Sequence, residues 1–182
     1  MGFEEVEALT PVDVLRRAGM DVKTVSISKS KEVVGAHGVT VVADLTFDEA
    51  DFTECDWLIL PGGMPGATNL YDCKPLCNLL LKHNTEGGHI AAICAAPAVV
   101  LGELGLLDGK EATCYPGFES VAPQAIFQER RVVVADNIVT GNGPSSALVF
   151  ALTIVAESKG DQEAKEVGEG MLYYDRSLNY YL

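Results

Sequence analysis

The feature that most constrains this chain is a short apolar strand that turns directly into a helix at a cysteine. Residues 90–93 are apolar and predict a buried strand, Cys94 follows at once, and residues 98–104 have helical spacing. Two alanines and Pro97 form the turn, and proline suits the first turn of a helix because its missing N–H would have no partner there. The stretch therefore predicts a nucleophile elbow that lifts Cys94 off the end of a sheet.

The place of Cys94 at the start of a helix bears on its reactivity. The positive end of the helix dipole favours the thiolate, which is the reactive form of cysteine, so we expect a low thiol pKa. The alternative is a structural cysteine, because free cysteines commonly pack in protein interiors as small hydrophobic residues. The stretch by itself leaves both interpretations open.

Composition and charge limit the class of protein. The chain has 182 residues, 48% of them hydrophobic and 21% charged, which is typical of a soluble globular protein. With no internal repeat, low-complexity tract or linker, residues 1–182 are expected to form a single domain. The net charge of −13 argues against nucleic acid or an anionic membrane surface as a partner, and no apolar run reaches the ~18 residues of a membrane helix.

The cysteines indicate a reducing compartment. There are five, an odd number, and no secretory signal precedes them, so we expect free thiols in the cytoplasm. Cys73 and Cys77 lie four residues apart and share a helix face, but no clustered histidine or further cysteine accompanies them. We therefore expect no metal site.

Strands and helices alternate along the chain, which predicts an α/β fold with a doubly wound, mostly parallel sheet. A helix over residues 4–18 contains Pro11, which should kink or split it. The other expected helices cover residues 73–83, 98–104, 147–158 and 161–170, the penultimate one capped by Ser145 or Ser146, and strands are expected over residues 21–28, 33–34, 39–42, 56–60, 90–93, 112–114, 131–135 and 137–140. A Tyr-rich tail closes the chain.

Three loops are expected at the carboxyl ends of strands, where doubly wound sheets bind ligands. They cover residues 61–66, 94–97 and 141–145. The convergence of these loops is a stronger indication of a functional site than any one of them.

These stretches resemble the ThiJ/PfpI superfamily, in particular its parkinsonism-associated deglycase branch. The matching segments are Gly2-Phe3-Glu4-Glu5-Val6-Glu7, residues 11–19, Leu60-Pro61-Gly62-Gly63 with Gly66 and Asn69-Leu70, residues 91–97 and residues 140–145. They occur in the family's order and spacing over about residues 2–158. The resemblance implies a flavodoxin-like sandwich of the class I glutamine amidotransferase type, and a homodimer.

The resemblance also implies roles for five residues. Cys94 is the reactive cysteine, and Glu7 is the acid whose protonated carboxyl hydrogen-bonds to the sulfur. The backbone N–H groups of Gly63 and Ala95 form an anion pocket. His37 lies in the turn where the family often has an arginine that reaches a dimer mate's site, and it could serve the same purpose as a donor. A carboxyl beside a thiolate is a like-charge pair, so one member should hold a proton. Without the resemblance, Glu7 would be interpreted as an exposed first-turn carboxylate.

Two of the chain's departures from the superfamily bear on its activity and its fold. The protease-like branch has a histidine directly after its cysteine, where this chain has Ala95, so a peptidase dyad of adjacent residues is absent. The superfamily also has a buried strand immediately before the Gly-Phe-Glu-Glu segment, whereas this sequence begins at Met1-Gly2. Either the sequence starts late or something else fills the gap in the sheet.

The resemblance, together with the reactive cysteine, implies two functions of different class. The first is glyoxalase or deglycase chemistry on small reactive carbonyls, without a cofactor, in which Cys94 forms a hemithioacetal and Glu7 moves the proton. The second is an oxidative-stress sensor or chaperone that responds to oxidation of Cys94. An intracellular peptidase and a thiazole monophosphate biosynthesis protein are less favoured, because the histidine and a phosphate-binding cluster of basic residues are missing.

Overall fold

A four-stranded sheet lies at the centre of the computed structural model, which describes residues 2–173. The strand order is β5 (Trp57–Leu60), β6 (His89–Ile93), β10 (Ile138–Gly141) and β9 (Val132–Ala135). The first three strands are parallel, and β9 pairs with β10 in the antiparallel direction. The predicted mostly parallel α/β fold is confirmed.

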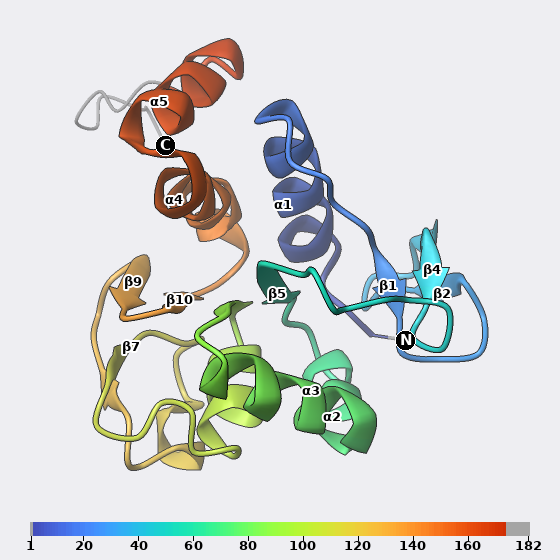
Figure 1. The fold of residues 1–182 in the computed structure, drawn as a ribbon. Helices are drawn as coiled ribbons and strands as arrows, with labels where there is room; N and C mark the ends of the chain where they lie inside the picture. Colours follow the sequence, from blue (N-terminus) through green and yellow to red (C-terminus); the bar gives the residue numbers. More distant parts are fainter. Residues whose placement is uncertain (1, 174–182) are drawn as a thin grey trace.

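Helices cover both faces of this sheet (Figure 1). One face carries α1 (Glu5–Arg17), α4 (Ala147–Lys159) and α5 (Asp161–Gly170), and the other carries α2 (Gly66–Asp72) and α3 (Lys74–Thr85). Alternate residues of the strands point to the two faces, as the twofold period of a strand requires. Ala91 and Ile93 therefore join the core cluster with Phe150, whereas Ile90 and Ala92 join the cluster with Leu80.

Three smaller strand pairs surround the main sheet. β1 (Val25–Ser26) pairs in parallel with β4 (Leu45–Thr46), and β7 (Glu111–Ala112) pairs in parallel with β8 (Ile126–Phe127). β2 (Glu32–Val34) and β3 (Thr40–Val42) form the predicted hairpin. The strand expected over residues 21–28 is thus reduced to two paired residues, because β4 is its one partner among the residues that the structure describes.

Four local predictions differ from the structure. Pro11 does not split helix α1, because its missing N–H leaves a single intrahelical bond unmade while Pro11, Val14 and Leu15 bury one face of the helix. The helix expected over residues 98–104 is a π-helix, η1 (Pro97–Gly102). An apolar period cannot distinguish a π-helix from an α-helix. Helix α2 was not predicted.

The fourth difference concerns the start of α4. Ser146 lies at the N-cap position but makes no side-chain capping bond. Its hydroxyl instead donates to Asn142 Oδ1 at 2.6 Å, within the short 3₁₀ turn η3 (Pro144–Ser146); a second such turn is η2 (Glu119–Val121). The Tyr-rich tail lies outside the described residues. Among those described, no helix has the length and apolar character needed to cross a membrane.

Candidate active site

Cys94 lies at the elbow that follows β6. Its backbone has φ 66°, a left-handed conformation that residues other than glycine rarely adopt and that costs roughly 1–3 kcal/mol. Two hydrogen bonds hold it: Cys94 N donates to Gly141 O at 2.9 Å, and Tyr115 N donates to Cys94 O at 2.8 Å. Only 8% of the residue is exposed. The surrounding loops thus impose the strained turn that places the sulfur.

Glu7 lies in the first turn of α1 and is 1% exposed, so it is not a solvated carboxylate. Its Oε2 accepts a hydrogen bond from Gly62 N at 3.1 Å. Its carboxyl is close enough to the Cys94 thiol for a side-chain hydrogen bond that affects the pKa of both groups. The buried Oε1 has no well-aligned partner within residues 2–173. Glu7 and Cys94 therefore form a coupled pair closed off from bulk water.

The environment of Glu7 favours its protonated form. Burial is the largest cause and raises the pKa of Glu7 to about 7, and the negative charge of Glu4 adds to the rise. The Cys94 thiol and the Gly62 N–H donate hydrogen bonds to the ionised carboxylate and so act to lower the pKa of Glu7. Near neutral pH, Glu7 therefore exists in both protonation states, as a general acid or base must.

The prediction of a low thiol pKa is wrong for the unliganded pair. Burial, followed by the charge and hydrogen bond of Glu7, raises the pKa of Cys94 to about 12. The backbone N–H groups of Gly63 and Ala95 donate to the sulfur and lower it, but not enough to compensate. The six-residue π-helix after Cys94 offers little dipole against these effects. A thiolate therefore forms when the thiol proton moves to Glu7, rather than in advance.

The two glycines after β5 allow this close approach. A Cβ on Gly62 would lie 2.5 Å from both Cys94 Cβ and Glu7 Oε2. Gly63 has φ 91°, and a Cβ there would lie 2.4 Å from Glu4 N. Gly62 was not singled out from the sequence as a site residue, although its place in a Gly-Gly pair directly after a buried strand was the available signal.

The family of this protein follows from a match to a family model over most of the chain. Residues 1–157 match the DJ-1/PfpI family. The chain belongs to the DJ-1/PfpI family. The resemblance to the ThiJ/PfpI superfamily is thereby confirmed.

Individual DJ-1/PfpI proteins give the extent of the similarity. Protein DJ-1 homolog B of Arabidopsis thaliana is 42% identical over 167 residues, which cover 91% of this chain and 38% of that protein, so the chain spans less than half of this relative. Glutathione-independent glyoxalase DJR-1.2 of Caenorhabditis elegans is 31% identical over 90% of this chain and 87% of its own length. The structure of oxidized Toxoplasma gondii DJ-1 has a TM-score of 0.91 and 41% identity, with 94% of each chain covered, and it confirms the flavodoxin-like fold.

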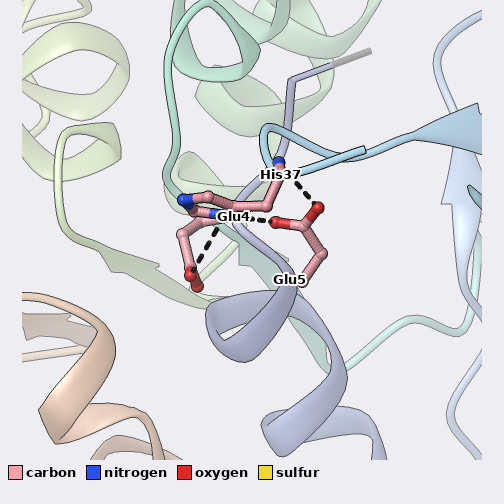
Figure 2. Close-up of side chains that lie close together, drawn as sticks. All are labelled: Glu4, Glu5 and His37. Carbon is pink, nitrogen blue, oxygen red and sulfur yellow. Dashed lines mark hydrogen bonds and ion pairs between the residues drawn. The ribbon is translucent and has the colours of Figure 1, made fainter. Parts of the chain in front are cut away.

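His37, the fifth residue expected in this DJ-1/PfpI site, lies in the β2–β3 turn and pairs with α1 of its own chain. Its Nδ1 lies 2.8 Å from Glu5 Oε2, and its side chain is 71% exposed (Figure 2). His37 N also donates to Glu5 Oε1 at 2.8 Å. The structure thus brings Cys94, Glu7, Gly63 and Ala95 together and attaches His37 to the helix that carries Glu7.

One group of described residues has the spacing that a metal site needs. It consists of Glu4, Glu5 and His37, whose potential ligand atoms lie within 4.8 Å of one another. Hydrogen bonds already occupy these carboxylates. Glu5 accepts from the turn, and Glu4 Oε2 accepts from Glu7 N at 2.7 Å, which caps α1. Their arrangement fits a structural clasp between the hairpin and α1. Cys73 and Cys77 do not belong to this group, and the Cys77 thiol donates to Tyr71 O at 3.0 Å.

The clasp predicts the titration of His37. The hydrogen bond and charge of Glu5 raise the pKa of His37. Burial alone would raise the pKa of Glu5, but hydrogen bonds from the side chain and backbone of His37 outweigh it and hold that pKa at about 2. Glu5→Gln is therefore expected to lower the pKa of His37, measured by NMR titration of its ring protons. An unchanged His37 would contradict the pairing.

The raised pKa of Glu7 predicts how stability depends on pH. The folded protein holds this proton up to about pH 7 and the unfolded chain up to about pH 4.5, so the stabilisation is complete below the lower value and is lost as pH rises through the upper one. Glu7→Gln removes this loss. We therefore compare the free energy of unfolding of Glu7→Gln with that of the wild type. The difference, variant minus wild type, should be about 3 kcal/mol more positive at about pH 8 than at about pH 4. Urea unfolding at both pH values measures the difference; equal differences would contradict the burial of the charge.

Proposed function

We propose that this protein is a cofactor-independent glyoxalase or deglycase that acts on small reactive carbonyls such as methylglyoxal. The observation that carries the proposal is the buried Cys94–Glu7 pair, in which a nucleophile contacts an acid whose pKa is about 7. A nucleophile, a base of matched pKa and two convergent backbone N–H groups are what addition to a carbonyl requires. The similarity to a protein named as a glutathione-independent glyoxalase supports it.

The first step is addition of the thiol to the aldehyde carbon. The Cys94 Sγ–carbon bond forms, the thiol proton passes to ionised Glu7, and the carbonyl π electrons move to the oxygen. The N–H groups of Gly63 and Ala95, which donate to the sulfur before reaction, would stabilise the developing oxyanion. Return of the proton from Glu7 to this oxygen gives the hemithioacetal.

The second stage converts the hemithioacetal to product. Glu7, ionised again, takes the proton from the former aldehyde carbon, and the resulting enediolate is reprotonated on the neighbouring carbon. This gives a lactoyl thioester of Cys94. Water cleaves the thioester, so that one methylglyoxal and one water yield one lactate and restore the thiol. The balance needs no oxidant, reductant or cofactor.

The test is lactate formation from methylglyoxal by the purified chain without glutathione. Turnover in excess of the protein concentration is expected. Loss of methylglyoxal without lactate would mean that the aldehyde merely modifies side chains, and it would overturn the proposal.

A second candidate is a sensor of peroxide, favoured by the two N–H groups at the sulfur. Oxidation of the Cys94 thiol by two peroxides gives a sulfinate and two waters, and the N–H groups of Gly63 and Ala95 could bind its oxygens. Peroxide titration followed by mass spectrometry distinguishes the two functions. Selective oxidation of Cys94 without carbonyl turnover would favour the sensor, whereas oxidation spread over all five cysteines would favour neither.

We also propose a homodimer in the cytoplasm. Membership of the family supports the dimer, and the five free cysteines support a reducing compartment. The exposed ring of His37 is available to a second copy, in which it would act as a donor near the partner's site. Sedimentation analysis of the wild type tests the dimer. A lower affinity for methylglyoxal in His37→Ala, with the dimer intact, would support the role of His37.

A further inference from the structure

Glu5 is a buried, ionised carboxylate in the first turn of α1, two residues before Glu7. The residue is 8% exposed, and its pKa of about 2 keeps it charged throughout the neutral range. A carboxylate withdrawn from water in this way needs hydrogen-bond donors around it. No step of the proposed reaction uses this group, so its burial needs a separate explanation.

The partners of Glu5 come from the turn that joins β2 to β3. Its Oε1 accepts hydrogen bonds from His37 N at 2.8 Å and from Val39 N at 3.3 Å. Its Oε2 lies 2.8 Å from His37 Nδ1 (Figure 2). Gly35 completes the enclosure, because a Cβ there would lie 2.3 Å from Glu5 Oε1. The turn therefore encloses one carboxylate of α1, and only a glycine at position 35 leaves room for it.

Further backbone bonds tie the start of α1 to its surroundings. Glu4 N donates to Gly62 O at 2.9 Å, and Gly62 N donates to Glu7 Oε2 at 3.1 Å. In the hairpin turn, Ala36 N donates to Phe3 O at 2.7 Å, just before the helix begins. The first turn of α1 is thus held both by the hairpin and by the loop that follows β5.

The carboxyl of Glu7 has few contacts of its own to fix it. Among residues 2–173 it accepts from Gly62 N and pairs with the Cys94 thiol, while its buried Oε1 has no well-aligned partner. Its position therefore depends on the backbone of the first turn. The N–H groups of such a turn have no partners within the helix and need others to hold them. Glu5 makes three hydrogen bonds from this turn of the helix to the hairpin.

We propose that Glu5 is a positioning residue for the carbonyl addition. By binding the β2–β3 turn it fixes the first turn of α1, and with it the separation between the Glu7 carboxyl and the Cys94 sulfur. A displacement of about 1 Å at a reacting group lowers a rate by as much as about 100-fold. The inference rests on the proposed function, whereas the contacts that carry it do not.

Two substitutions test the inference from the two sides of the contact. Glu5→Ala removes the carboxylate, and Gly35→Ala leaves Glu5 in place but puts a methyl group where its Oε1 lies. Both should lower kcat for lactate formation from methylglyoxal at least about 10-fold, with KM within about threefold of wild type. Glu5→Gln should restore kcat to within about fivefold of wild type, because its amide keeps an acceptor for His37 N and a donor for the His37 ring.

Gly170→Ala and Glu49→Gln are the matched controls. A Cβ on Gly170 would meet nothing within 4 Å. Glu49 is a hydrogen-bonded carboxylate that accepts from Thr46 N at 2.8 Å, and it is not among the groups that shift the pKa of Glu7. Both controls should keep kcat within about threefold of wild type.

Alkylation of Cys94 by iodoacetamide at about pH 9, followed by mass spectrometry, reports the position of Glu7 without turnover. Burial, and then the charge and hydrogen bond of Glu7, raise the pKa of Cys94, so moving Glu7 away should make the sulfur more reactive. Cys114 is the internal reference, because burial also raises the pKa of its thiol to about 12. The ratio of the Cys94 rate to the Cys114 rate should rise at least about fivefold in Glu5→Ala and Gly35→Ala. General loosening of the fold would raise both rates alike.

The outcomes separate this inference from the proposed function. If the wild type forms no lactate, the proposed function fails, and the alkylation ratio still tests the position of Glu7. An unchanged ratio, a loss of kcat that the controls share, or a rise in KM with kcat intact would overturn the inference. If Glu5→Ala does not fold, as judged by circular dichroism, Gly35→Ala decides alone.

Discussion

Cys94→Ser is expected to lower kcat/KM for lactate formation from methylglyoxal by at least about 1,000-fold. A serine hydroxyl is far less acidic than a thiol, so Glu7 with a pKa of about 7 cannot remove its proton efficiently. The size and burial of the side chain hardly change, so the loss reports chemistry rather than folding. Initial rates of lactate formation, with circular dichroism as a check on the fold, measure the effect.

Cys114→Ser is the matched control for this substitution. Cys114 is buried to nearly the same extent, with 6% exposed against 8% for Cys94, and burial also raises the pKa of its thiol to about 12. Cys114 is not among the groups that shift the pKa of the Glu7 carboxyl. Its replacement should leave the rate within about threefold of wild type. Similar losses in both variants would mean that Cys94 is not the nucleophile.

Glu7→Gln is expected to lower the rate by roughly 100- to 10,000-fold and to remove its dependence on pH near neutrality. Glu7 must be ionised to accept the thiol proton, so the wild-type rate should rise as pH increases through about 7. Glutamine keeps the hydrogen bond from Gly62 but cannot take a proton. The measurement is kcat/KM for methylglyoxal against pH for both proteins.

Glu4→Gln is the control for the pH profile. The charge of Glu4 raises the pKa of Glu7, and glutamine retains an oxygen that can cap Glu7 N. The inflection should therefore persist and move to lower pH. An inflection near pH 7 that survives in Glu7→Gln would assign it to another group and contradict the proposed role of Glu7.

The elements with strong local signals were predictable. The run before Cys94, the Gly-Gly loop after β5 and the hairpin around residues 35–38 all form as expected, because chain neighbours specify them. The π-helix after Cys94 and the helix α2 were not predictable, since an apolar period reports which face is buried and not the hydrogen-bond ladder beneath it.

The properties of Glu7 and Cys94 in the site could not be predicted from local sequence either. From sequence, Glu7 would be an ordinary first-turn carboxylate, and only the resemblance gave it a role. The structure buries it because α1 packs against α4 and presents Glu7 to Gly62, 55 residues away. Likewise, the sequence suggested that a helix dipole lowers the pKa of Cys94, whereas burial and the Glu7 charge raise it.

The sequence by itself determined the positions at which the backbone can bend and the side chains that can react: the Cys94 elbow, the paired glycines and the order of strands and helices. The tertiary structure alone decided the protonation states of Cys94 and Glu7. The reason is that turns and amphipathic periods are set by residues close in the chain, whereas desolvation, charge and the pairing of sheet edges depend on residues that only folding brings together.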